Sequence, residues 1–306
     1  MRFRDALEGY WLENRLAFSQ NTVNDYSLTF RRFEEMVGDR PVSEIGADDV
    51  RRFLYQLAEM GLGDKSRANA WTALSSFWSW AEVELDIPHV IRGRVKRPRY
   101  SRKRIVPYAE DEVVLMIKAC DLTDTWRSST GRLVQSKRPT AERDRLMIIV
   151  LLDTGVRASE LCNLELRDYD NGDGRLTVRH GKGDKERDVY LGARGQKALW
   201  KYLLKRKGDP GSAPLFPSRS GAALERNNLR KTLQRIGRRA GVAGVTVHRF
   251  RHTFAINFLR NGGNVLALQE LLGHEKLDTV RIYARLAEVD LRRAQQAASP
   301  ADGWGL

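Results

Sequence analysis

Apolar side chains recur at helical spacing along the first ninety residues, and no stretch there alternates convincingly as a strand would. The first residues of this pattern are Leu12, Leu16, Tyr26, Phe30 and Phe33. Two further helices are expected over residues 47–60 and 64–85. The apolar repeat of the later helix is typical of a buried stripe rather than of base-stacking groups, and it comprises Trp71, Leu74, Phe77, Trp78 and Ala81.

After residue 108 the pattern changes to helices around one short β-region. The sequence RLTVRH, the turn GKGDK and the sequence ERDVYL predict an antiparallel pair of strands over residues 175–191. A polar loop is expected over 123–139, and an apolar helix should end near Gly155. Other helices are expected near residues 109–120, 193–207, 225–240, 247–260, 264–272 and 276–297. The predicted fold class is mainly α with a small antiparallel β-region.

A proline-containing basic segment separates these two regions. Pro98 and Pro107 disfavour a continuous helix, so residues 91–107 are expected to form an extended linker. Eight basic residues and no acid lie in its first part: Arg92, Arg94, Lys96, Arg97, Arg99, Arg102, Lys103 and Arg104. Between two folded domains, spanning residues 1–90 and 108–306, such a run favours a strap along a DNA backbone over a merely solvated linker.

Net charge narrows the class of partner. The chain has 306 residues and a formal net charge of +14, which favours a polyanionic partner because Lys and Arg release counterions from phosphates. Charge alone does not separate DNA from RNA or anionic lipid.

The remaining composition favours a reducing compartment. Only two cysteines are present, Cys120 and Cys162, which gives no disulfide framework. The N-terminus has no apolar segment typical of a signal peptide, and no apolar run is long enough to span a membrane. A cytoplasmic protein that associates with the nucleoid is therefore expected.

Two short stretches could hold an anion. Gly155 should end one helix and place Arg157 in the first turn of the next, where its fork can face an anion beside unpaired backbone N–H groups. Lys182, between two glycines at a hairpin tip, can reach into a cleft, although the spacing is not that of a phosphate-binding loop. Taken singly, a surface Arg paired with Glu160 and an exposed turn lysine are the more ordinary interpretations.

Three further stretches lie in the last third of the chain. His248 and Arg251 share a helix face, and they combine a proton-transfer group with a phosphate fork. His248 and His252 could instead ligate zinc, but no further His or Cys cluster completes such a site, so no metal is expected. His274 follows a helix-ending glycine, and Tyr283 lies in a predicted helix, where a tyrosine is usually just packed.

In combination these groups can cut a phosphodiester without a metal or cofactor. Guanidinium forks stabilise the charge that develops on the phosphate in its pentacovalent transition state. A tyrosine hydroxyl needs help to lose its proton, and the leaving 5′-oxygen needs a proton donor.

At this point the sequence resembles the tyrosine recombinase, or phage integrase, family and especially its compact Xer-like members. The motifs that carry the resemblance are TGVRASEL, GKGDKER, HRFRHTFA and LGHEKLDTVRIYARL. The ordered catalytic set of the family falls on Arg157, Lys182, His248, Arg251, His274 and Tyr283. The resemblance implies that Tyr283 attacks the scissile phosphate to give a 3′-phosphotyrosyl bond and a free 5′-hydroxyl.

It also implies a role for each of the other five residues. Arg157 and Arg251 would clamp the non-bridging oxygens, and Lys182 would protonate the leaving 5′-oxygen. His248 would assist proton removal from the nucleophile, and His274 would donate a hydrogen bond to the phosphate. Because the phosphotyrosine keeps the energy of the phosphodiester, a partner strand can reseal the break without ATP.

The architecture implied by the resemblance is a two-domain, C-shaped DNA clamp. Residues 1–90 would form a helical, SAM-like core-binding domain and residues 108–306 the catalytic domain. The implied substrate is double-stranded DNA with an inverted-repeat core site, bound by a homotetramer on two duplexes that pass through a Holliday junction. An accessory recombinase or regulator could take part, and no membrane is involved.

Several alternatives stay open at the level of sequence. The biological task could be integration of a mobile element or Xer-like resolution of chromosome dimers. A non-catalytic DNA-binding protein on the same fold, a type IB topoisomerase, a telomere resolvase and, more distantly, a metal-dependent nuclease are the rival classes. Residues 122–140 form a longer connection than the smallest family members have, with a DNA or protomer contact as hypotheses. Glu160 and His252 are assigned structural roles.

Overall fold

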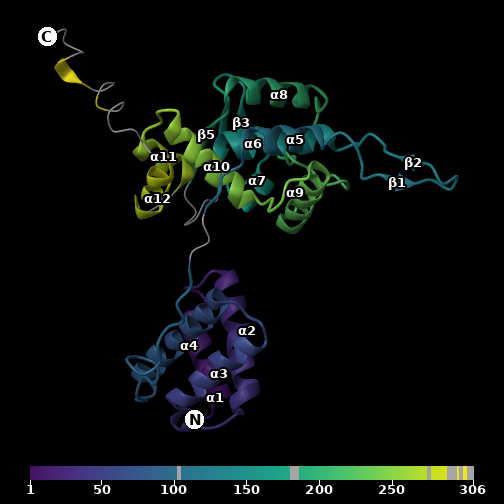
Figure 1. Cartoon of the computed structure of the whole chain (residues 1–306). Coiled ribbons are helices and arrows are strands. Elements are labelled where there is room, and N and C mark those ends of the chain that lie inside the picture. Colours follow the sequence, from purple (N-terminus) through teal and green to yellow (C-terminus); the bar gives the residue numbers. More distant parts are fainter. Residues whose placement is uncertain (102–104, 180–185, 274–276, 288–294, 296–298, 302–306) are drawn as a thin grey trace. The chain divides into compact units, whose positions relative to one another are not determined.

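The computed structural model describes residues 1–101, 105–179, 186–273, 277–287, 295 and 299–301. Its contacts divide the chain into two compact units, Met1–Lys103 and Arg104–Leu306, each with its own apolar core (Figure 1). Helices dominate both units, and the small sheets belong to the second, which confirms the predicted fold class. None of the described helices has both the length and the apolar composition needed to cross a bilayer.

The N-terminal unit is a helical bundle in which α4 packs against α1, α2 and α3. Its elements are α1 (Phe3–Asn14), α2 (Gln20–Val37), the 3-10 turn η1 (Val42–Glu44), α3 (Ala47–Glu59) and α4 (Asp64–Glu84). The predicted buried stripe of α4 is confirmed at Leu74, Phe77 and Trp78. The apolar spacing at the start of the chain was misleading, because Leu12 and Leu16 are 87% and 97% exposed.

The packed N-terminal unit extends past residue 90, into the segment expected to be an extended linker. Ile91 and Val95 are buried in its core. The Trp71 indole N–H donates to the Val95 carbonyl at 3.0 Å, and His89 Nδ1 accepts the Ile91 backbone N–H at 3.2 Å. Of the segment's described residues, only 96–101 and 105–107 have neither regular secondary structure nor a turn or bend. The basic residues of the segment that are described all have exposed side chains: Arg92, Arg94, Lys96, Arg97 and Arg99.

The C-terminal unit is arranged around α10, which packs against α6 on one side and α12 on another. Its helices are α5 (Glu110–Lys118), α6 (Ala141–Thr154), α7 (Ala158–Asn163), η2 (Leu166–Asp168), α8 (Ala193–Leu204), α9 (Arg226–Ala240), α10 (Val247–Arg260), α11 (Val265–Leu272) and α12 (Leu277–Ala287). Most of the predicted continuation of the last helix, to residue 297, lies outside the described residues.

A three-stranded antiparallel sheet lies in this unit, in the order β3-β4-β5. Its strands are β3 (Tyr169–Asp170), β4 (Arg175–Val178) and β5 (Arg187–Tyr190). Leu176 pairs with Val189, and both side chains are buried because alternate residues of each strand face the core. The predicted strand pair is thus confirmed, whereas its turn lies outside the described residues.

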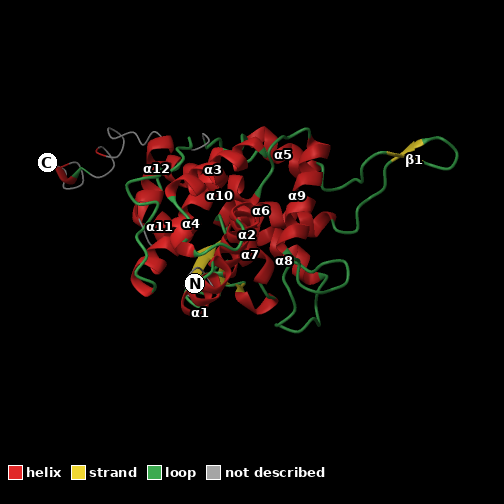
Figure 2. Ribbon diagram, turned by 90° about the horizontal axis from the view of Figure 1, so that it is seen from below, coloured by secondary structure: helices red, strands yellow, loops and turns green. Residues whose placement is uncertain are grey.

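The segment expected to be a polar loop contains a short hairpin instead. Strands β1 (Trp126–Arg127) and β2 (Leu133–Val134) pair antiparallel, and the hairpin extends away from the helices of its unit in both views (Figures 1 and 2). Its base is fixed by Asp124, which forms ion pairs with Arg238 and Arg239 of α9. The pattern did not predict these strands because each is only two residues long, too short to show an alternation of apolar and polar residues.

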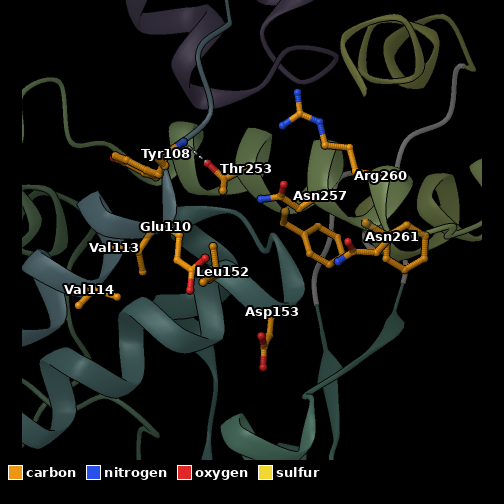
Figure 3. Close-up of a pocket in the computed structure, with 13 residues that line it drawn as sticks. Tyr108, Glu110, Val113, Val114, Leu152, Asp153, Thr253, Asn257, Arg260 and Asn261 are labelled. Atoms are coloured by element: carbon orange, nitrogen blue, oxygen red, sulfur yellow. Dashed lines mark hydrogen bonds between the residues drawn. The ribbon is translucent and has the colours of Figure 1, made fainter. Parts of the chain in front are cut away.

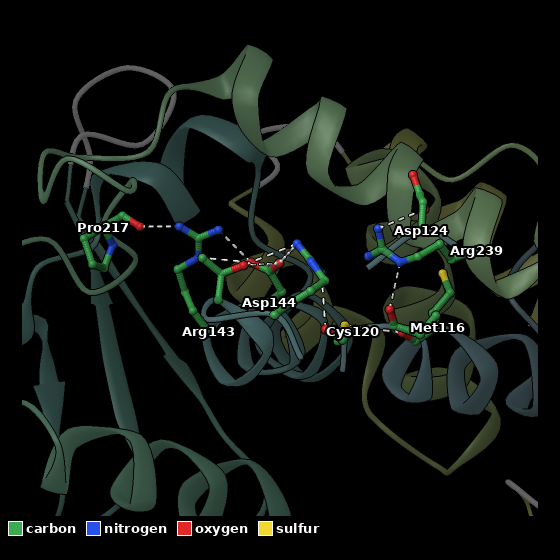
Figure 4. A network of polar contacts seen from close by, with 10 residues as sticks. Met116, Cys120, Asp124, Arg143, Asp144, Pro217 and Arg239 are labelled. Carbon is green, nitrogen blue, oxygen red and sulfur yellow. Dashed lines mark hydrogen bonds and ion pairs between the residues drawn. The ribbon is translucent and has the colours of Figure 1, made fainter. Parts of the chain in front are cut away.

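Next to this base lies a buried charge cluster around Asp144 of α6 (Figure 4). The Asp144 carboxylate is fully buried and accepts hydrogen bonds from Arg138 at 2.6 Å and from Arg143 at 2.7 Å and 3.0 Å. Arg138 also donates to the Cys120 carbonyl at 3.3 Å, so the cluster ties α6 to the chain after α5.

We expect Asp144→Ala to destabilise the protein by about 3–5 kcal/mol, because it leaves two buried guanidinium groups without their counter-ion. The matched control is Glu142→Ala on the same helix, which removes only an exposed ion pair with Lys205 and should cost at most about 1 kcal/mol. Denaturant unfolding of both variants measures the difference. Equal losses of unfolding free energy in the two variants would contradict a stabilising role for the Asp144 charge cluster.

Candidate active site

Two chain turns bring the candidate arginines together. Gly155 ends α6 with a left-handed backbone (φ 61°), and a side chain there would collide with Phe254 of α10. The turn delivers Arg157 to the start of α7, as predicted. Its guanidinium Nη1 donates to Glu160 Oε1 at 2.7 Å, and its Nη2 donates to the Gly273 carbonyl at 3.2 Å.

Arg251 on α10 reaches the same two turns from inside the protein. It is only 2% exposed, and it donates to the Gly155 carbonyl at 2.8 Å and to the Leu272 carbonyl at 2.6 Å. Burial, and then the charge of Arg157, lower the pKa of Arg251 to about 10, so it remains a cation at neutral pH. The two arginines are thus held close together, at a place where a phosphate would relieve their repulsion.

Glu160 has a larger role than the local pairing with Arg157 that the sequence indicated. Its buried carboxylate also binds Arg187 of β5, with Nη1–Oε1 at 3.0 Å and Nη2–Oε2 at 2.7 Å. Burial acts to raise the pKa of Glu160, but the hydrogen bonds from Arg187 and Arg157 outweigh it and lower that pKa to about 2. Glu160 therefore positions Arg157 against the sheet.

We expect Glu160→Gln to lower stability by about 2 kcal/mol or more at neutral pH, because two arginines lose a charged acceptor. The folded-state pKa lies below the usual 4.5, so the carboxylate stabilises the fold above that value and this stability is lost as the pH falls towards about 2. The gap in unfolding free energy between wild type and variant should therefore shrink between about pH 7 and about pH 3. A difference in unfolding free energy that stays constant with pH would contradict the role of an ionised Glu160 in stability.

The histidines and the candidate nucleophile meet where α10 packs against α12. Thr246 caps α10 by accepting the Arg249 backbone N–H, and the helix then presents His248 and His252 one turn apart, with ring centroids 4.6 Å apart. The Tyr283 hydroxyl lies 2.9 Å from His252 Nδ1. His252, to which the sequence gave only a structural role, is therefore in direct contact with the candidate nucleophile.

Burial governs the ionisation of this pair. Tyr283 is 3% exposed, and its pKa is raised by burial, against the lowering effect of the Arg251 charge. The pKa of His252 is lowered to about 4 by burial, then by the neighbouring His248 and Arg251. At neutral pH the tyrosine is therefore protonated and the imidazole neutral.

Lys182 and His274 lie outside the described residues, as do Arg102, Lys103 and Arg104. In the sequence, Arg187 of β5 follows Lys182 after a few residues, and Gly273 directly precedes His274. Both flanking residues contact the arginine cluster, since Arg187 binds Glu160 and the Gly273 carbonyl accepts from Arg157. Among the described residues, no group of three or more His, Cys, Asp or Glu side chains could hold a metal ion.

A pocket on the other face of α10 takes no part in this cluster (Figure 3). It is lined by α5, α6 and α10, with Asp153, Thr253 and Asn257 among its residues. At 100° per residue, Thr253 and Asn257 point away from the side of the helix that carries His248 and His252. The candidate residues of α10 therefore lie on a different face of the helix from this pocket.

Two protein-family models match separate parts of the chain. Residues 100–289 match the model described as "Phage integrase family", and residues 7–84 match "Phage integrase, N-terminal SAM-like domain". The chain is 32% identical to tyrosine recombinase XerA of Thermococcus kodakarensis, over 92% of this chain and 90% of the relative. It is 30% identical to tyrosine recombinase XerD of Mycobacterium tuberculosis, over 96% and 97%.

Solved structures show the same likeness. A XerH site-specific recombinase bound to a palindromic difH substrate, in a post-cleavage complex, is 26% identical with a TM-score of 0.69, covering 92% of this chain and 80% of that one. A lambda integrase dimer bound to a core site has a TM-score of 0.73 over 92% and 95%, and at 18% identity it supports the fold alone. The chain belongs to the phage integrase family and is a tyrosine site-specific recombinase.

Proposed function

We propose that Tyr283 is the nucleophile of this recombinase and that Arg157 and Arg251 hold the scissile phosphate. The observation that carries this proposal is the meeting of both guanidinium groups at the Gly155 and Gly273 turns, where the charge of Arg251 also acts on Tyr283. Guanidinium forks there would stabilise the negative charge that the phosphate gains as it becomes pentacovalent.

The reaction would proceed by exchange of one phosphate ester for another. The Tyr283 oxygen attacks phosphorus, the bond to the 5′-oxygen breaks, and the products are a 3′-phosphotyrosyl bond and a free 5′-hydroxyl. Lys182 is proposed to give the leaving oxygen its proton, and His274 to donate a hydrogen bond to the phosphate. His248 is proposed to assist removal of the tyrosine proton. Attack by the 5′-hydroxyl of a partner strand then completes strand exchange.

Double-stranded DNA is the proposed partner, and α9 provides a surface for it. The helix contains no acidic residue, and its exposed face carries basic and amide side chains: Arg226, Asn227, Arg230, Lys231, Gln234 and Arg235. Arg, Asn and Gln are the side chains best suited to base edges in the major groove. A groove lined by Ser159, Arg230 and Val247 joins this face to the positions next to Arg157 and His248.

The exposed basic residues of the interdomain segment would contact the phosphate backbone, with Arg92, Lys96 and Arg97 among them. We also propose an inverted-repeat core site and a tetramer on two duplexes, as a Holliday junction requires. Resolution of chromosome dimers and integration of a mobile element are both compatible with this chemistry. We also propose that the protein acts at the nucleoid in the cytoplasm, with an accessory recombinase as a further partner.

A nicked suicide substrate tests the proposal, because loss of a short strand after cleavage traps the covalent intermediate. We expect a protein–DNA adduct that survives denaturant, carries the DNA by its 3′ end and forms in the presence of EDTA. Lack of an adduct with DNA that the protein binds site-specifically would contradict catalysis. Relaxation of arbitrary supercoiled DNA by the monomer would instead indicate a topoisomerase.

A further inference from the structure

The Tyr283 side chain is buried, with its ring among apolar side chains and its hydroxyl beside His252. The ring packs in the cluster formed by α10, α11 and α12, which includes Phe254, Leu268 and Val280. A buried phenol hydroxyl needs a hydrogen-bond partner, since leaving it without one costs free energy. His252 Nδ1, 2.9 Å away and one helical turn from His248, supplies that partner.

The direction of this hydrogen bond depends on the tautomer of His252. Burial first, and then His248, whose ring lies 4.6 Å away, and Arg251 disfavour a positive charge on His252. A neutral imidazole with Nδ1 as acceptor carries its hydrogen on Nε2. With that tautomer the Tyr283 hydroxyl donates, and its lone pairs are left for another partner.

We propose that His252 is a positioning residue for cleavage: in the tautomer with its hydrogen on Nε2, it accepts a hydrogen bond from the Tyr283 hydroxyl and so fixes the direction of the attacking oxygen before His248 assists removal of the proton. The phenol hydrogen lies near the ring plane and has two positions there. Acceptance by Nδ1 selects one of them, and the oxygen lone pairs then point away from His252. This inference rests on the proposed function, because it needs Tyr283 to be the nucleophile.

Positioning explains the surroundings of His252 better than general-base catalysis does. With a pKa of about 4, the imidazole is too weak a base to take the proton of a tyrosine whose own pKa is raised. It can still restrict the hydroxyl, and a misplaced reacting group can cost about 100-fold in rate. A purely structural hydrogen bond would change stability and leave the cleavage rate of the bound complex intact.

Three substitutions separate these roles by geometry. In Asn the Oδ1 atom is bonded to Cγ, as Nδ1 is in His, so His252→Asn keeps an acceptor near the same place. The longer side chain in His252→Gln places its amide nearer to Nε2, and His252→Leu removes the acceptor. Single-turnover cleavage of the nicked suicide substrate at saturating protein gives the rate, DNA titration gives affinity, and thermal unfolding reports the fold.

We expect His252→Leu and His252→Gln to cleave roughly 10- to 100-fold more slowly than wild type, with DNA affinity changed by less than about twofold, and His252→Asn to recover most of the rate. Nitrogen NMR of wild type should show His252 Nδ1 without a proton, with a signal that shifts in Tyr283→Phe. Cleavage by His252→Leu at the wild-type rate would overturn the inference, as would losses in all three variants that follow their thermal stability alone.

The same series keeps the two proposals apart. If Tyr283→Phe still forms the adduct, the proposed nucleophile is wrong and the role of His252 fails with it. If Tyr283→Phe forms no adduct while His252→Leu cleaves normally, the nucleophile stands and only the positioning role is overturned.

Discussion

Tyr283→Phe is expected to bind its DNA normally and to form no covalent adduct. The substitution removes one oxygen from a packed ring, so its effect on stability should be about 1 kcal/mol. Loss of the nucleophile should lower cleavage by roughly 10⁴-fold or more, the scale seen when a nucleophile is deleted from an enzyme. The measurement is adduct formation on the suicide substrate, followed by denaturing electrophoresis.

Tyr190→Phe is the matched control for this prediction. Tyr190 lies in β5 of the same unit with an exposed side chain, so its hydroxyl can be removed with little effect on folding or cleavage. An adduct that persists in Tyr283→Phe would identify another nucleophile. If neither variant forms an adduct, the loss of cleavage cannot be assigned to the Tyr283 hydroxyl in particular.

The second large effect is expected for Arg251→Lys. Lysine keeps the positive charge, but a single ammonium group cannot reproduce the planar fork that donates to both the Gly155 and the Leu272 carbonyls. We expect cleavage to fall by about 100- to 1000-fold, the range seen when one donor to a developing oxyanion is removed. Single-turnover cleavage at saturating protein measures the loss.

Arg249→Lys provides a control on the same helix. Arg249 donates to the Val106 and Ala243 carbonyls, binds Glu112, and stacks 4.0 Å above the Tyr108 ring, so it shares the structural demands of Arg251 without belonging to the candidate site. We expect the Arg249→Lys variant to be less stable than wild type but to cleave DNA at close to the wild-type rate once the DNA is bound. Equal loss of cleavage in both variants would assign Arg251 a structural role only.

Much of the fold could be predicted from the sequence, because its periodic segments are long. The helical repeat of Trp78 and its neighbours describes α4, and the alternation of Leu176 and Val178 describes β4. Short or boundary features could not be predicted. The β1 and β2 strands are too short to show an alternating pattern, and Val95 is buried within a run of exposed basic residues that was expected to be linker throughout.

For the candidate site, sequence motifs indicated the residue types but not the contacts between distant segments. The pairing of Arg157 with Glu160, three residues apart, could be expected from local spacing. The contacts of Glu160 with Arg187 and of His252 with Tyr283 span 27 and 31 positions, so only the folded chain brings them together. The one local signal for His252 was its place one turn after His248, which suggested a zinc ligand that no further His or Cys cluster completed.

The central claim is that Tyr283 becomes joined to the 3′ end of the cleaved strand, and peptide mapping tests it most directly. The trapped adduct is digested with nuclease and protease, and the peptide that carries the residual nucleotide is sequenced by mass spectrometry. The account predicts a 3′-nucleotide on Tyr283 and a free 5′-hydroxyl on the released strand. A nucleotide on any other residue, or a bond through a 5′-phosphate, would contradict it.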